Sequence, residues 1–239
     1  QSPSLGGSWS RQASSPARAG RGMAGAPVRM VGLGLRDRSD GASTVVENSI
    51  ELGADAQFII ERSEISEFDH GQIDWRGILE SKHWLVLSSS CPLDGESMKW
   101  AWGSSLTFAE LEGCKTAMVV DVPEDSDRLE EAWGSVIERI RQIHLLFIGP
   151  KAMKAIAELE GIEEGLLLGE IRSRSLVPLA CSFDPEKGVA IVSHSLGQEI
   201  VEVGEEIDLE RWLAGFLCEL PKSGSGTSGI ASAARPMHG

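Results

Sequence analysis

The sequence predicts an α/β fold of three layers, in which a mostly parallel sheet lies between two layers of helices. Two observations lead to this prediction. Short apolar runs alternate with longer helical segments along the chain, and several of these runs are nearly continuous rather than interrupted by polar residues. Continuous apolar runs are typical of strands covered on both faces, and strand–helix alternation is typical of parallel sheets.

Six apolar runs predict strands, and five segments between or after them predict helices. The expected strands are QFIIE (57–61), WLVLS (84–88), TAMVVD (116–121), HLLFI (144–148), LVPLAC (176–181) and VAIVS (189–193). The expected helices are 73–81, 96–113, 127–142, 150–159 and 208–220. Two helices carry end signals. Helix 127–142 opens with acids and closes with Arg139 and Arg141, while helix 150–159 has Pro150 near its start and Gly161 beyond its end.

The first 43 residues form a low-complexity segment, and we expect the α/β domain to span residues 44–239. Residues 1–36 contain five arginines and no acid. This composition is typical of an organellar transit peptide, for a plastid or a mitochondrion, or of a disordered linker. An organellar location is therefore expected, with a cytoplasmic one as the alternative.

The net charge of −14 is unevenly distributed. Without the five N-terminal arginines, 17 basic residues remain against 36 acidic ones, which gives the rest of the chain a net charge of −19. Such a body repels nucleic-acid phosphates and anionic membrane surfaces, so direct nucleic-acid binding is not expected. No stretch approaches the ~20 apolar residues that cross a bilayer, so no membrane span is expected.

The cysteines and histidines do not predict a metal site. The four cysteines are widely spaced, without a C-x-x-C pair, and each lies among apolar or small residues, so buried reduced thiols are expected. The five histidines share no metal-ligand spacing, and His144 is expected at a strand edge. The segment VGLGLRDR (31–38) carries a G-x-G pair but lacks the third glycine of a dinucleotide-binding turn.

Polar residues after the predicted strands are the candidates for a site. Ligands of open parallel sheets bind beyond the carboxyl ends of the strands, where Asp121 and the serine run 88–90 lie. Asp121 is either a carboxylate facing a phosphate or metal, or an N-cap or loop acid ahead of the next helix. The serines either line a cleft or bond to the backbone. Asp208 and Glu210, at the start of helix 208–220, are either catalytic carboxylates or acids that complement the helix dipole.

The order of these segments from about Asp55 onward resembles the ribokinase-like (pfkB-type) carbohydrate kinases, and most closely the 2-keto-3-deoxygluconate kinase branch. IIERSEIS, GCKTAMVVDVPED and FDPEKGVAIVS each resemble a family segment, and WLAGFL (212–217) falls on the family signature FvAGFl. The resemblance implies a ribokinase-like fold. It also implies ATP and Mg as cofactors if the chain is active, Arg62 as a substrate-binding residue, and Asp121, Lys187 and Gly188 as nucleotide-binding residues.

The segment before the signature departs from the family. In the family a Gly-Ala-Gly-Asp turn opens this helix, holds the transferring phosphoryl group with backbone N–H groups and supplies the Asp as general base. Here the four positions hold Ile207, Asp208, Leu209 and Glu210, so the resemblance assigns the base to Glu210, or to Asp208 after a register shift. Side chains at Ile207 and Leu209 are expected to crowd the phosphate. The family's N-terminal third has no counterpart, so a truncated and degenerate relative is expected.

Three functions remain open from the sequence. The first is a catalytically impaired, pfkB-type pseudokinase that acts as a structural or scaffold subunit, inside a larger organellar protein complex. The second is an active ATP-dependent kinase that transfers the γ-phosphate to a hydroxyl of a small-molecule sugar or sugar acid. The third is an unrelated soluble α/β protein.

Overall fold

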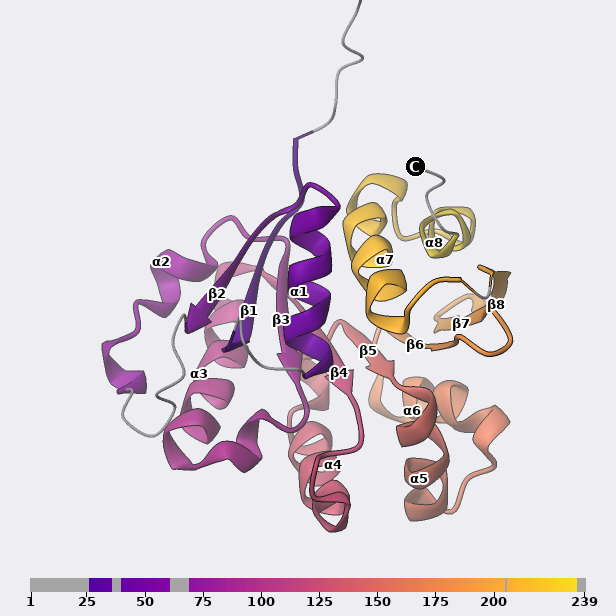
Figure 1. Ribbon diagram of the computed structural model, residues 1–239, viewed down its shortest axis with the longest axis horizontal. Helices are drawn as coiled ribbons and strands as arrows, with labels where there is room; N and C mark the ends of the chain where they lie inside the picture. The colour runs from indigo at the N-terminus through magenta and orange to yellow at the C-terminus, as the bar shows by residue number, and fades with distance from the viewer. Residues whose placement is uncertain (1–25, 36–39, 61–68, 205, 236–239) are drawn as a thin grey trace, which may run out of the picture.

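A computed structural model describes residues 26–35, 40–60, 69–204 and 206–235 of the chain. They form an eight-stranded sheet with the strand order β2-β1-β3-β4-β5-β6-β7-β8, which can be followed from left to right in Figure 1. The strands are β1 (Arg29–Leu35), β2 (Asp55–Ile60), β3 (Trp84–Ser88), β4 (Lys115–Val120), β5 (Leu145–Ile148), β6 (Leu179–Asp184), β7 (Val189–His194) and β8 (Gly197–Glu202).

The first six strands are parallel, and the last two form an antiparallel edge. β2, β1, β3, β4, β5 and β6 pair in parallel, whereas β7 runs antiparallel to both β6 and β8. The chain proceeds from β1 outward to β2 and then returns to β3 on the other side of β1. The strand order therefore reverses between β1 and β3, and such a switch point is where open α/β sheets bind ligands.

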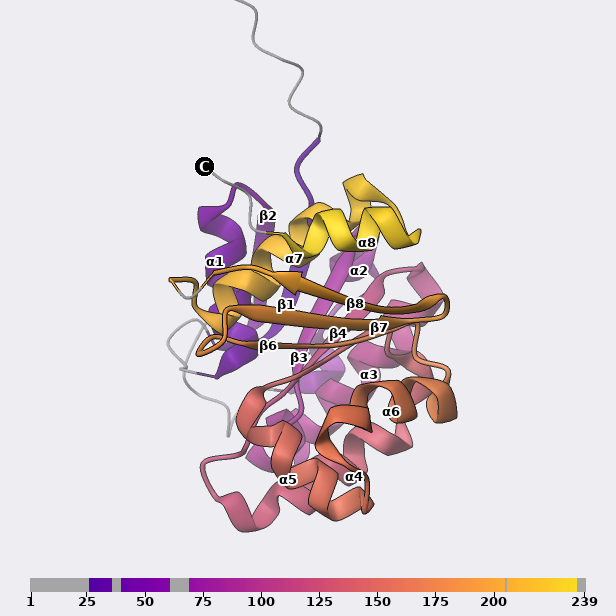
Figure 2. The same cartoon turned by 90° about the vertical axis from the view of Figure 1, so that its right-hand side faces the viewer.

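Helices cover both faces of the sheet, as predicted. Figure 2 shows α7 and α8 on one side of the strands and α3 to α6 on the other, and the two cores agree with this division: α1, α7 and α8 pack on one face and α2 to α6 on the opposite face. The helices are α1 (Gly41–Glu51), α2 (Trp75–Leu79), α3 (Glu96–Glu112), α4 (Leu129–Glu138), α5 (Pro150–Glu160), α6 (Leu167–Ser175), α7 (Leu209–Ser223) and α8 (Thr227–Ala234).

The central strands form where the sequence is continuously apolar. Every residue of β3 and β5 is buried, which confirms that these runs are covered on both faces. The end signals of α5 are also confirmed. Pro150 is its first residue, and Gly161 follows it in the left-handed conformation.

The folded domain begins earlier than residue 44. β1 pairs with both β2 and β3 in the sheet, and α1 begins at Gly41. The two glycines of β1 allow α1 to pack closely against it. An added Cβ at Gly32 would lie 2.7 Å from Val46, and one at Gly34 would lie 2.6 Å from Ser43 Oγ. The G-x-G pair of this segment therefore has a packing role.

Two further comparisons concern the fifth predicted strand and the cysteines. β6 begins at Leu179 rather than at residue 176, because Leu176 ends α6 in the left-handed conformation and Pro178 follows it. All four cysteines are free and buried, as expected. In the described part of the chain, no helix is long and apolar enough to cross a membrane.

Candidate functional site

The candidate site lies at the edge of the sheet where the parallel strands end. β1, β3 and β4 end at this edge, and α1, α5 and α7 begin there (Figure 1). Each helix N-terminus presents backbone N–H groups and the positive end of a helix dipole. The edge therefore has the elements of an anion-binding site before its side chains are considered.

Asp121, the first residue after β4, lies between the first turns of α1 and α5. Gly149, the residue before α5, donates its backbone N–H to the carbonyl of Val120 at 2.9 Å. An added Cβ at Gly149 would lie 2.5 Å from Asp121 Oδ1, and one at Gly41 would overlap Asp121 Oδ2. The carboxyl group thus occupies space that only two glycines leave open. Asp121 is not the capping residue of the next helical turn, because Asp125 has that role.

Two further carboxylates face Asp121 across the edge. Burial raises the pKa of Asp121 from its ordinary value of 3.8 to about 6, and the negative charges of Glu210 and Asp40 contribute to the increase. Asp40 caps α1, since its carboxylate accepts hydrogen bonds from the backbone N–H and the hydroxyl of Ser43, both at 2.9 Å. The N-termini of α1, α5 and α7 therefore have carboxylates beside them, and these carboxylates disfavour the binding of an anion at this edge.

The start of α7 holds the two acids predicted as catalytic or capping groups. Asp208 is the N-cap residue and its carbonyl accepts the N–H of Trp212 at 2.9 Å, but its side chain makes no capping hydrogen bond. Glu210 lies in the first turn, near enough to Asp121 to raise its pKa. Ile207 and Leu209 are partly buried and pack against the core under α7. The apolar residues at the two expected glycine positions thus anchor the entry to the helix.

Lys187 and Gly188 lie at the same edge, in the hairpin between β6 and β7. The carbonyl of Gly188 accepts hydrogen bonds from Val203 and Gly204, which ties this hairpin to the segment that leads into α7. Lys187 Nζ lies 2.7 Å from Asp184 Oδ2, and this hydrogen bond raises the pKa of Lys187. The lysine is thus paired with a carboxylate of its own hairpin.

The serine run at the end of β3 makes hydrogen bonds within itself and to the neighbouring strand β4. Ser88 Oγ and Ser90 Oγ are 2.8 Å apart, and the backbone N–H of Ser89 donates to the carbonyl of Val119 at 2.9 Å. Ser89 Oγ is buried and has no hydrogen-bond partner. The interpretation that these hydroxyls bond to the backbone fits Ser88, whose Oγ accepts the N–H of Ser90 at 3.2 Å, but not Ser89.

The remaining predictions concern Arg62, a metal site and His144. Arg62 lies outside the described residues. No group of three or more His, Cys, Asp or Glu side chains in the described ranges is arranged to hold a metal ion. His144 is confirmed at a strand edge, where Nδ1 accepts the backbone N–H of Thr116 at 3.2 Å.

Sequence reasoning missed Asp40, Gly41 and Gly149. Asp40 precedes a segment rich in small residues, and an Asp in that position is a signal for a helix start. The two glycines carry no local signal, because what they contact is Asp121, far away in the sequence.

Comparisons with known proteins agree on the fold. No family model and no curated protein matches this chain. Among solved structures, a fructokinase from Vibrio cholerae, crystallised with fructose, ADP and calcium, matches with a TM-score of 0.63 and 13% identity over 87% of this chain and 89% of that chain. A 2-dehydro-3-deoxygluconokinase from Thermotoga maritima gives a TM-score of 0.63 and 13% identity, over 87% and 92%.

A third structure of the same kind is an aminoimidazole riboside kinase from Salmonella enterica. It matches with a TM-score of 0.60 and 12% identity, over 86% of this chain and 89% of that chain. All three proteins are sugar or nucleoside kinases by name, and each aligns across most of both chains. The chain therefore has the α/β fold of the ribokinase-like, pfkB-type carbohydrate kinases.

Proposed function

We propose that this chain is a ribokinase-like protein that does not transfer phosphoryl groups and that acts as a non-catalytic subunit. The observation that carries the proposal is the carboxylate cluster at the edge of the sheet. Asp121 is partly buried, and desolvation together with the negative charges of Glu210 and Asp40 raises its pKa to about 6, so a further negative charge is unfavourable there.

A transferring phosphoryl group carries negative charge that must be stabilised by N–H groups and cations. At this edge the described carboxylates oppose it instead, and Lys187 is paired with Asp184. The residues present therefore do not fit the phosphates of a nucleotide, and we derive no catalytic step through such a complex.

The start of α7 supports the same proposal. The resemblance places the phosphate-holding glycines of the kinases at Ile207 and Leu209, and here both side chains are partly buried and pack against the core. Glycine lets the main chain approach a phosphate closely, and a bulky side chain in its place restricts the backbone conformations that such a turn needs. A chain that keeps the fold without this turn is suited to a scaffold role. We place that role in a larger organellar complex because the basic N-terminal segment resembles a transit peptide.

Two measurements test this function. ATP consumption with a panel of sugars and sugar acids is expected to equal the rate without protein. The tagged chain, isolated from its source, is expected to co-purify stoichiometrically with a larger assembly. Turnover that depends on one sugar would refute the non-catalytic role, and a free chain would refute the scaffold role.

An active sugar or sugar-acid kinase is the second candidate, and one observation favours it. The N-terminus of α7 has no side-chain cap, so its first backbone N–H groups are not bonded by a capping side chain and face the edge where a phosphate would bind. In this alternative Arg62 binds the substrate and Glu210, or Asp208, is the base. Sugar-dependent turnover that Glu210→Gln or Asp208→Asn abolishes would establish it.

A further inference from the structure

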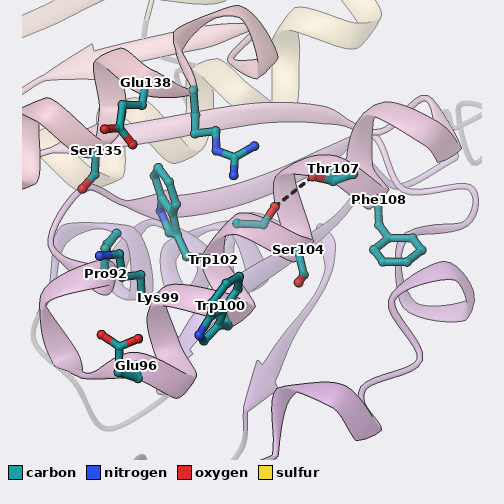
Figure 3. Close-up of a pocket in the computed structure, with 12 residues that line it drawn as sticks. Pro92, Glu96, Lys99, Trp100, Trp102, Ser104, Thr107, Phe108, Ser135 and Glu138 are labelled. Carbon is teal, nitrogen blue, oxygen red and sulfur yellow. Dashed lines mark hydrogen bonds between the residues drawn. The ribbon is translucent and has the colours of Figure 1, made fainter.

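The outer surface of α3 places a protruding aromatic side chain beside a hollow. Trp100 is 60% exposed, although tryptophan is usually largely buried. Gly103, Ser104 and Thr107 follow it on the same side of the helix, at the three- and four-residue spacing of one helical face. Figure 3 shows Trp100, Ser104 and Thr107 along this face, with Ser135 and Glu138 of α4 across the cavity.

The hollow between α3 and the end of α4 has a volume of about 550 Å³. It exists because α3 carries small residues at its centre. An added Cβ at Gly103 would meet nothing nearer than the Arg139 guanidinium, at 3.7 Å. Trp102, which is 4% exposed, lines the cavity from α3. A glycine within a helix costs up to about 1 kcal/mol relative to alanine, and here it leaves a space that is large enough for an aromatic side chain.

The two tryptophans are held in place before anything binds. The Trp100 ring stacks on His70 at a centroid distance of 6.2 Å and an interplanar angle of 16°. Trp102 Nε1 donates to the carbonyl of Ser88 at 3.2 Å. Fixed aromatic side chains lose little conformational entropy on association, and tryptophan is enriched among the residues that dominate binding energy.

The charge around the hollow differs from that of the chain as a whole. The cavity is lined by two cations, Lys99 and Arg139, and two anions, Glu96 and Glu138, so its net charge is zero. The chain as a whole carries −14. Two copies of so acidic a chain repel each other over most of their surface, and this repulsion is weakest where the local charges balance.

We propose that this face of α3 is the interface of a two-fold symmetric homodimer, in which Trp100 of each copy fills the hollow of the other. A protrusion and a matching hollow on one surface are self-complementary, as a two-fold interface requires. The axis passes near Gly103 and Ser104, where the two helices approach most closely. In an antiparallel pair this centre places Trp100 opposite Thr107 of the second copy. Leu111, 65% exposed, extends the apolar contact at each end.

The oligomeric state tests the interface. We expect sedimentation equilibrium of the full chain to show a monomer–dimer equilibrium between about 1 and 100 μM, typical of a small interface. Trp100→Ala is expected to raise the dissociation constant at least about 30-fold, because it removes a dominant side chain from each copy and the loss of even one has about that effect. The control is Leu196→Ser on the β7–β8 hairpin, since Leu196 is 72% exposed but distant from α3, and it should leave the constant unchanged.

Symmetric cross-linking tests the position of the axis. Because the native cysteines are all buried, Ser104→Cys provides an accessible thiol and is expected to form a disulfide-linked dimer under mild oxidation. Ser173→Cys, on the exposed side of α6, is the control. After the same oxidation it is expected to run as a monomer in non-reducing electrophoresis. A chain that is monomeric throughout the concentration range, a dimer that Trp100→Ala leaves intact, or equal cross-linking of the two variants would overturn the proposal.

Discussion

At the scale of single residues, the decisive feature is the carboxyl group of Asp121. It lies partly buried between two glycines at helix starts, and the negative charges of Glu210 and Asp40 act on it. The helix dipoles of α1 and α5 favour its negative charge, whereas burial and the neighbouring acids oppose it. The pKa of about 6 shows that the opposing contributions are larger.

This balance predicts how stability depends on pH. The unfolded chain loses the Asp121 proton near pH 3.8, whereas the native chain keeps it until about pH 6, so the free energy of unfolding contributed by this group falls by about 3 kcal/mol between these values. Asp121→Asn removes this decrease in the free energy of unfolding, because asparagine does not ionise. We expect urea unfolding at about pH 8 to show the variant to be more stable by about 1–3 kcal/mol, with almost no difference below about pH 4.

Asp55→Asn, at the exposed start of edge strand β2, is the matched control for this substitution. It is expected to change the free energy of unfolding by less than about 0.5 kcal/mol across the same pH range. An Asp121→Asn variant that is less stable than the unmodified chain at about pH 8 would contradict this electrostatic account.

The glycines beside Asp121 give a second residue-scale prediction. Gly149→Ala places a Cβ 2.5 Å from Asp121 Oδ1, and we expect it to lower the free energy of unfolding by about 1–3 kcal/mol. Gly134→Ala in α4, where an added Cβ meets nothing within 4 Å, should instead raise it by up to about 1 kcal/mol. Both are measured by urea unfolding. If Gly149→Ala costs the same with Asp121→Ala as without it, the clash is not with Asp121.

Residue-scale features were predicted from the sequence only where position alone reveals them. Asp121 was a candidate because it follows an apolar strand, and the structure places it at the expected edge. Its contacts with Gly41 and Gly149 join residues that are remote in the sequence, so no local sequence pattern predicts these contacts.

At the scale of elements, α7 carries the resemblance to the kinases and is fixed by its aromatic residues. Trp212 stacks on Phe216 at 5.2 Å and on Phe183 of β6 at 5.6 Å, and its Nε1 donates to the carbonyl of Ala234 in α8 at 2.9 Å. The apolar run WLAGFL therefore has a structural role here. It holds α7 on the sheet and α8 on α7, and this packing does not depend on the chemistry of residues 207–210.

This packing predicts a large effect of a small substitution. Trp212→Phe keeps a ring in the core but leaves the buried carbonyl of Ala234 without its donor, which is expected to lower the free energy of unfolding by about 1–3 kcal/mol. Leu196→Ala, at an exposed position of the β7–β8 hairpin, should change it by less than about 0.5 kcal/mol. Thermal unfolding followed by circular dichroism distinguishes the two, and equal shifts would contradict the anchoring role of Trp212.

Elements were predicted where their periodicity is strong and missed where it is weak. β3 spans the predicted residues because its first four are apolar and all five are buried. β8 was missed because it is an edge strand with mostly polar, exposed residues. α1 was missed because GASTVVENSIE is rich in glycine, serine, threonine and valine, which favour helix weakly, and packing against β1 stabilises it instead.

At the scale of the whole molecule, the sequence predicted a parallel sheet between helix layers, and the strand order and the comparisons with solved kinases confirm it. The order of segments was informative because alternating strands and helices follow few topologies. The extent of the domain was not predicted, since β1 and the first residues of α1 lie within the segment expected to be low in complexity. The activity does not follow from the fold, because function depends on the site and not on the architecture.

Calorimetric titration with magnesium and ATP tests the central claim most directly. If the carboxylate cluster has replaced the phosphate site, the full chain at about pH 7.5 shows no saturable heat up to about 1 mM nucleotide, which corresponds to a binding free energy weaker than about −4 kcal/mol. Saturable, magnesium-dependent binding of ATP below that concentration would contradict the claim that this ribokinase-like chain has lost its nucleotide site.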